Sequence, residues 1–216
     1  MDNSQRCFEL LQTGDTDGLR QILDRDSSAA EARDASGVSL VMQAIYRGRR
    51  DLAEVIAGKK QQLDIFEAVS LGKLQRLREC ARDASVVNSR SKDGFTALHF
   101  ACFFGPPEAA RILIELGAQV DAVAANPMKV MPLHSAVSTR NLKAARLLLE
   151  HGAPANARQQ AGWVPIHAAA QNGDRAMVEL LLKHGADPNI ANDEGKTPAM
   201  VAREKGHREI AEMLGG

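Results

Sequence analysis

The chain has 216 residues, of which 44% are hydrophobic and only 4% aromatic, and its formal net charge is zero. A neutral chain gives no general reason to expect binding to nucleic acid or to an acidic membrane surface. No run approaches the ~18 apolar residues of a membrane span, and no secretory signal follows Met1–Arg6. We therefore expect a cytoplasmic protein that binds neither nucleic acid nor membrane.

The first eighty residues predict three helix pairs, because apolar residues recur at helical spacing on either side of glycines. In the first pair, apolar residues from Phe8 to Leu23 surround Gly14. The second pair opens at Ser39 and continues through 51–56. The third pair extends from Phe66 to Leu77 around Gly72.

The connection between the second and third pairs is unusually short. We take Leu63 as the equivalent of Ser39, a step of only 24 residues in this sequence. That spacing leaves room only for a tight link, so we expect any surface formed by the connecting loops to be interrupted there. We also expect the basic side chains of Arg47, Lys59 and Lys60 to stay solvated.

The rest of the chain repeats at a fixed period. Thr96, Met131, Val164 and Thr197 occupy one position, with steps of 35, 33 and 33 residues. A period of this length predicts a stacked array of repeats. The longer first step predicts that the loop around residues 126–128 has two extra residues.

Each repeat has the signals of two helices. Thr or Ser at the first position is a good N-cap, and a following Pro suits the first helical turn. A Gly about nine residues later stops the first helix, although Arg140 takes that place in one repeat. A leucine-rich second helix follows, with an apolar face that neighbouring repeats must bury.

Two motifs identify the repeat. The chain reads Gly-Phe-Thr-Ala-Leu-His at 94–99 and Gly-Ala-Asp-Pro-Asn at 185–189. This pattern resembles the ankyrin repeat, closely over residues 89–216 and more weakly over the divergent residues 1–88. The resemblance implies an all-α solenoid of about seven stacked helix pairs with short β-hairpin fingers, forming a single domain over 1–216.

The histidines and cysteines do not suggest a catalytic or metal site. His99, His134 and His167 occupy one repeat position, where the resemblance implies that the ring bridges a helix start to neighbouring backbone. Copies on successive packed helices would lie ~10 Å apart, too far to share a metal ion. No catalytic or nucleotide motif occurs, and the three cysteines lack metal-ligand spacing. We therefore expect no enzyme activity, no metal and no cofactor.

The scarce aromatic residues suggest a binding surface. In the ankyrin repeat, the fingertip and the end of the first helix face a concave groove. These places hold Tyr46, Phe95, Phe103, Phe104 and Trp163, with Met128 and Val130 on the longer finger between them. Clustered exposed aromatics are typical of interaction surfaces. The alternative is that side chains of adjacent fingers simply cover one another.

The sequence therefore predicts a monomeric, non-catalytic module that binds a protein partner through a preorganised groove. A second interpretation is a regulatory or inhibitory subunit that masks the active site of a partner enzyme. Groove residues vary freely while the framework stays fixed, so the pattern does not identify the partner.

Overall fold

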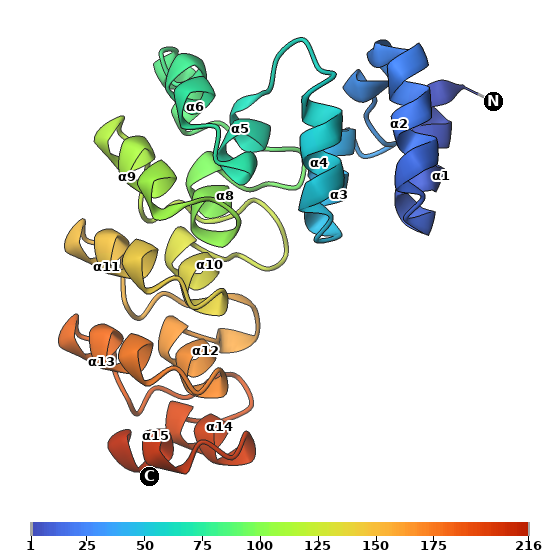
Figure 1. Cartoon of the computed structure of the whole chain (residues 1–216). Helices are drawn as coiled ribbons and strands as arrows, with labels where there is room; N and C mark the ends of the chain where they lie inside the picture. Colours follow the sequence, from blue (N-terminus) through green and yellow to red (C-terminus); the bar gives the residue numbers. More distant parts are fainter. Residues whose placement is uncertain (1, 216) are drawn as a thin grey trace.

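The helices form seven successive pairs in the computed structural model, which describes residues 2–215 (Figure 1). The pairs are α1 (Asn3–Thr13) with α2 (Thr16–Arg25), α3 (Leu40–Tyr46) with α4 (Arg50–Ala57), α5 (Ile65–Leu71) with α6 (Leu74–Cys80), α8 (Ala97–Phe103) with α9 (Pro107–Glu115), α10 (Pro132–Ser138) with α11 (Leu142–Glu150), α12 (Pro165–Gln171) with α13 (Arg175–Lys183), and α14 (Pro198–Glu204) with α15 (Arg208–Met213). Short turns η1 (Ser27–Glu31), α7 (Ala84–Val87) and η2 (Gln160–Gly162) lie in connections. The all-α solenoid predicted from the sequence is confirmed.

The pairs stack so that first helices face first helices and second helices face second helices. Figure 1 shows α8, α10, α12 and α14 in one row and α9, α11, α13 and α15 in another. The connecting loops project on the side of the first row. In the same view α1 to α4 are turned relative to the later pairs.

A continuous apolar core runs between the two rows. Leu98, Leu133 and Ile166 of the first helices have no exposed surface, and neither do Leu113, Leu148 and Leu181 of the second. Burying one such side chain contributes ~1.5–3 kcal/mol relative to leaving it in water. Because one pair cannot cover its own apolar face, each repeat depends on its neighbours.

Five connections form the fingers, which we number in chain order: finger 1 (33–39), finger 2 (90–96), finger 3 (123–131), finger 4 (158–164) and finger 5 (191–197). Four of them close with a backbone hydrogen bond spanning four residues, as between Ser91 N and Phe95 O at 2.8 Å. In finger 3 the bond joins Ala124 N and Val130 O, so the predicted two-residue extension is confirmed. Within the described residues, β pairing is limited to bridges at Arg33–Ser39 and Arg90–Thr96.

Adjacent fingers bond directly to one another. Ala125 N donates to Gly94 O at 2.9 Å, and fingers 3 to 5 are joined in the same way. Gly94 has a φ of 86°, and a Cβ there would lie 2.6 Å from Ala125 O. Only glycine allows both this backbone conformation and this close approach.

The link between α4 and α5 has no finger, as expected, but its register differs from the predicted one. The N-cap of α5 is Asp64, not Leu63: its Oδ1 accepts from Glu67 N at 2.9 Å. Glu67 Oε2 in turn accepts from Asp64 N at 3.0 Å. This reciprocal capping box makes the step from Ser39 25 residues rather than 24, because the helix begins where both bonds can form.

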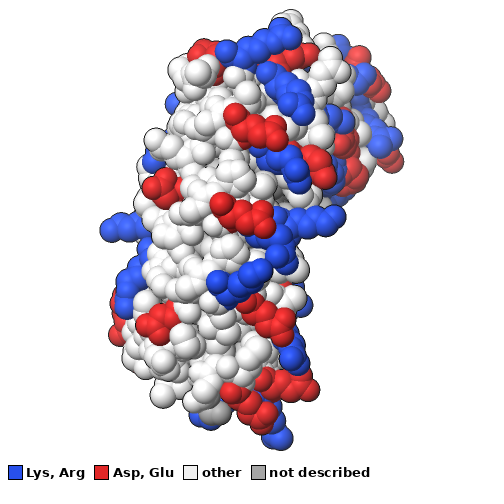
Figure 2. Space-filling model, turned by 90° about the vertical axis from the view of Figure 1, so that its left-hand side faces the viewer, with Lys and Arg blue, Asp and Glu red and all other residues white. Residues whose placement is uncertain are grey.

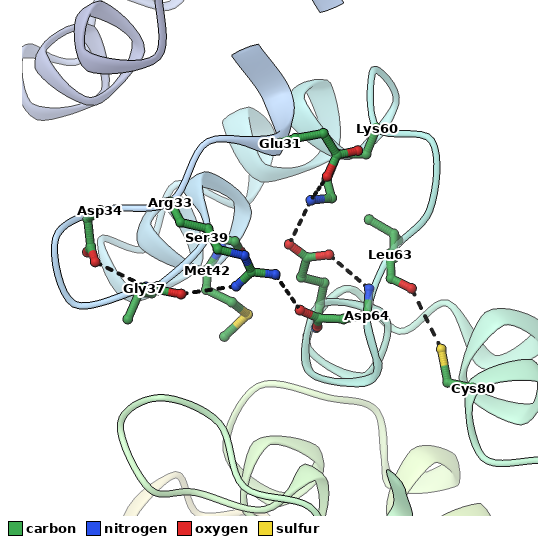
Figure 3. Close-up of polar contacts among 12 residues, drawn as sticks. Glu31, Arg33, Asp34, Gly37, Ser39, Met42, Lys60, Leu63, Asp64 and Cys80 are labelled. Carbon is green, nitrogen blue, oxygen red and sulfur yellow. Dashed lines mark hydrogen bonds and ion pairs between the residues drawn. The ribbon is translucent and has the colours of Figure 1, made fainter. Parts of the chain in front are cut away.

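Lys60 is a further correction. Arg47 and Lys59 are exposed as expected, whereas the Lys60 side chain is only 2% exposed. Its ammonium lies 2.7 Å from Glu31 Oε2 and 3.4 Å from Glu67 Oε1 (Figure 3). Glu67 is fully buried, so the nearby cation compensates a charge that would otherwise be costly to bury.

Candidate binding site

The three equivalent histidines act as structural bridges between repeats. In each, Nδ1 accepts a hydrogen bond from the backbone N–H of the residue just before the helix, so Nε2 carries the proton. Nε2 then donates to a carbonyl of the following repeat: His99 to Val130 at 3.1 Å, His134 to Ala157 at 2.9 Å and His167 to Lys196 at 3.0 Å. Burial lowers the pKa of His99 and of His134 to about 4. The bridging expected from the repeat pattern is confirmed.

Four of the predicted binding residues lie in one group of rings, which we call the aromatic cluster; its members are Tyr46, Phe66, Phe95, Phe100, Phe103 and Phe104. Phe103 and Phe104 are adjacent, with ring centroids 4.6 Å apart. The Tyr46 ring lies 6.0 Å from that of Phe104, although it comes from a different repeat. Such offset and edge contacts between rings are favourable.

Phe100 is the centre of the aromatic cluster, although it is not among the residues predicted from the sequence. Its ring lies 5.8 Å from Phe95, 6.4 Å from Tyr46 and 5.7 Å from Phe66. The sequence did contain a signal, because the equivalent positions in the next two repeats hold Ser135 and Ala168. Phe100 is therefore a buried ring at a position where these repeats have a small residue.

Tyr46 also ties the second helix pair to finger 2. Its hydroxyl donates a hydrogen bond to the Asp93 carboxylate. Burial, followed by the bond to Asp93, raises the pKa of Tyr46 well above its usual range. The ring is nevertheless 39% exposed, so one face of it remains open to a partner.

The other three predicted residues share a pocket of about 410 Å³ between fingers 3 and 4, which we call the Trp163 pocket. Met128, Val130 and Trp163 line it, together with polar side chains such as Gln160 and Gln171. The Trp163 ring lies 5.4 Å from that of His167. The structure therefore separates the seven predicted residues into two groups.

The two groups are neighbours. The His99 ring lies 5.6 Å from that of Phe95, and its Nε2 bonds to the carbonyl of Val130. Phe103 and Met128 are 47% and 45% exposed, whereas Phe95 and Phe104 are half-buried and pack against the core. Part of this surface is thus structural and part of it is open. We call the side formed by the fingers and first helices the groove face.

A third concavity lies where the link between α4 and α5 omits a finger. This link cavity, of about 290 Å³, is bounded by fingers 1 and 2. Its apolar lining is Val38, Met42, Tyr46, Phe66 and Phe100. Charged side chains from both fingers, and Asp64 from the start of α5, surround that lining.

The opposite side of the molecule has mixed charge. Figure 2 shows this face, on the side of the second helices, with basic and acidic side chains interspersed among uncharged ones. A mixed surface gives little attraction for a polyanion. None of the helices among residues 2–215 is long and apolar enough to cross a membrane.

A family model described as "Ankyrin repeats (3 copies)" matches residues 65–159 and 133–215, together well over half of the chain. The first four helices lie outside these matches. The geometry and the family model therefore agree on the type of repeat.

Several curated proteins are similar over part of the chain. One is the B-cell lymphoma 3 protein homolog of Mus musculus, 41% identical over 90 residues, covering 41% of this chain and 20% of that protein. Another is the E3 ubiquitin-protein ligase KEG of Arabidopsis thaliana, 34% identical, covering 70% of this chain and 10% of that protein. Protein phosphatase 1 regulatory subunit 27 of Mus musculus is 40% identical over 58 residues, which cover 27% of this chain and 38% of that protein. The matches span well under two thirds of each relative's own length.

Proposed function

The chain belongs to the ankyrin-repeat family, and we propose that it is a non-catalytic module that binds a partner protein through its groove face. Ankyrin repeats are in general protein-interaction modules, and stacked repeats present extended concave surfaces for this purpose. The observation that supports the proposal best is the set of exposed apolar side chains on one face, Tyr46, Phe103 and Met128.

The surface has the features of a preorganised interface. Fingers 2 to 5 are joined by backbone hydrogen bonds, and three histidines bond first helices to carbonyls in or just before the next finger. A rigid surface loses little conformational freedom on binding, so more of the contact energy appears as affinity. Exposed Phe103, and Met128 in the Trp163 pocket, would supply the apolar anchors that dominate such interfaces.

We also propose that residues 1–216 act as one monomeric domain. Two contacts support this across the link that lacks a finger: Lys60 with Glu67, and Tyr46 with Asp93. The first joins the second and third helix pairs within residues 1–88, and the second joins these divergent residues to the well-matched repeats.

The test is affinity capture from native lysate, comparing the wild-type chain with a Phe103→Ala/Met128→Ala variant. Both side chains are exposed, so the variant should fold. Leu116→Ala is the matched control, because Leu116 is 43% exposed at the end of a second helix. Partners captured equally by all three proteins would contradict the proposal.

A second candidate is a regulatory subunit that masks the active site of an enzyme. It is favoured by one observation, the similarity to a protein named as a regulatory subunit of protein phosphatase 1. If a captured partner is an enzyme, its activity should fall on addition of the wild-type chain but not of the double variant. Unchanged activity would leave binding alone as the function.

A further inference from the structure

The link cavity exists because one finger is missing. Elsewhere on the stack each finger bonds to the next, whereas fingers 1 and 2 are separated by a helix pair that contributes none. The first helices at this place are therefore left without the loop that covers them in later repeats. Met42 and Phe66 face the resulting cavity of about 290 Å³.

Arg33 shows what the missing finger would have supplied. The equivalent Arg90 donates to Gly94 O of its own finger and to Val123 O of the next, the latter at 2.6 Å. Arg158 repeats this arrangement with Ala191 O at 3.2 Å. Arg33 bonds to its own finger at Gly37 O, but no next finger follows. Its second donor instead reaches Asp64 Oδ2 at 3.3 Å, as Figure 3 shows.

Met42 also reflects the missing finger, because an apolar side chain stands where later repeats have a hydrogen-bonding histidine. It occupies the position that His99, His134 and His167 hold in later repeats, counted from the N-cap residue of each first helix. His99 and His167 donate to a carbonyl of the following finger and His134 to a carbonyl just before it, whereas the helix pair that follows Met42 has no finger. A thioether replaces the donor, so this part of the cavity is a flexible apolar surface suited to a side chain.

The charged groups around the cavity favour an anion. Asp64 is paired with Arg33, and Asp93 accepts hydrogen bonds from Tyr46 and Ser91. Among the described residues, the Lys92 ammonium has no hydrogen-bond or ion-pair partner. Its stem crosses finger 1 so closely that a Cβ on Gly37 would lie 3.2 Å from Lys92 Cγ. An unpaired cation is thus held at the rim of the cavity.

We propose that the link cavity binds an acidic turn of a partner protein, which takes the place of the missing finger. A backbone carbonyl of the turn accepts from Arg33, as Val123 does from Arg90. An apolar side chain of the turn rests on Met42 and Phe66, and a carboxylate pairs with Lys92. This inference rests on the proposed function, since it assigns a partner chemistry to one part of the groove face.

A peptide that copies residues 186–197 of this chain is a suitable probe. It contains finger 5 with the acidic residues Asp187, Asp193 and Glu194, so it has both the turn and the charge. The probe is titrated into the full chain labelled with ¹⁵N. We expect saturable shifts of the amides of Gly37, Ser91 and Lys92.

Two comparisons test the charge. Lys92→Glu should weaken probe binding about fivefold or more, because reversing one charge turns an attraction into a repulsion. Lys143→Glu, an exposed lysine on α11, should leave binding unchanged. A probe with Asn for both aspartates and Gln for the glutamate should also bind about fivefold or more weakly.

The inference is overturned if the shifts fall only around the Trp163 pocket, if none appears, or if Lys92→Glu binds the probe as tightly as the wild type. Partner capture that still depends on Phe103 and Met128 would then leave the proposed function standing. In the opposite case, the probe binds at the link cavity but partner capture does not depend on Phe103 and Met128. That result would support this inference and contradict the proposed function.

Discussion

The guanidinium of Arg33 lies 3.3 Å from the carboxylate of Asp64, across the link between α4 and α5 that has no finger. The equivalent Arg90 and Arg158 bond instead to backbone carbonyls of the next finger. At this repeat position the arginine therefore donates to a carboxylate where no backbone carbonyl of a next finger can accept its hydrogen bond. The Arg33–Asp64 and Lys60–Glu67 ion pairs therefore hold the second and third helix pairs together across this link.

The buried Lys60–Glu67 ion pair should make stability sensitive to the loss of either partner. Lys60→Met would leave the fully buried Glu67 without its nearest cation, and we expect a loss of ~3 kcal/mol or more in the free energy of unfolding. Lys60→Met/Glu67→Gln should recover at least ~1 kcal/mol, because it removes both charges and Gln can still cap α5. Urea denaturation measures the free energy of unfolding of both variants.

The control is Lys59→Met, which breaks a surface ion pair with Asp24 and should cost no more than ~1 kcal/mol. Equal losses for the two lysines would contradict this account.

The backbone at Arg140 should be strained. It has a φ of 57°, where the equivalent Gly48, Gly173 and Gly206 have φ values of 70°, 69° and 82°. We expect Arg140→Gly to be more stable than Arg140→Ala by ~1 kcal/mol, because both lose the side-chain bond to Asn172 O and only Gly is relaxed in this conformation. Thermal melts of the two variants give the difference directly. Equal stability would show that this backbone position carries no strain.

Acidification should destabilise the stack through the bridging histidines. The pKa of His99 and His134 is about 4 in the folded chain, below the ~6.5 of an exposed histidine. As the pH falls, the unfolded chain therefore takes up these protons first. The stability that the two rings contribute is complete above pH ~6.5 and is lost as the pH falls toward about 4.

Between pH 7 and pH 5 we expect a loss of ~1–2 kcal/mol for each of the two histidines, measured by urea unfolding. His134→Gln lacks the ionisable ring, so its stability should fall less over the same interval. If wild type and variant lose stability equally, the histidines are not the cause.

Mutations should distinguish the exposed residues of the groove face, which bind the partner, from the residues that pack in the core. Phe103→Ala should reduce partner affinity by ~2 kcal/mol or more while changing stability by no more than ~0.5 kcal/mol, because its ring is 47% exposed. Trp163→Ala should weaken binding similarly. Leu148→Ala, a truncation in the core, should cost ~2–5 kcal/mol of stability. Should the two aromatic variants unfold like Leu148→Ala while their folded fraction binds normally, these rings are packing residues.

The number of helix pairs and the longer finger 3 could be predicted because they depend on local spacing. The bridging role of the histidines was implied by the resemblance to the ankyrin repeat. The link could be predicted only in part. Asp64 and Glu67 form a capping box that is visible in the sequence, whereas the repeat spacing alone points to the apolar Leu63. The burial of Lys60 could not be foreseen, since it depends on Glu31 and Glu67 meeting across two repeats. Phe100 was missed because a buried ring in an apolar helix resembles ordinary core.

Hydrogen exchange of the chain, alone and with a captured partner, tests the central claim most directly. If the groove face binds the partner, backbone amides in fingers 2, 3 and 4 should exchange more slowly in the complex, including those of Phe95, Val130 and Trp163. Amides of the second helices α9, α11 and α13 should change little. Slowing confined to the second helices, with the fingers unchanged, would contradict the account and place the interface on the opposite face.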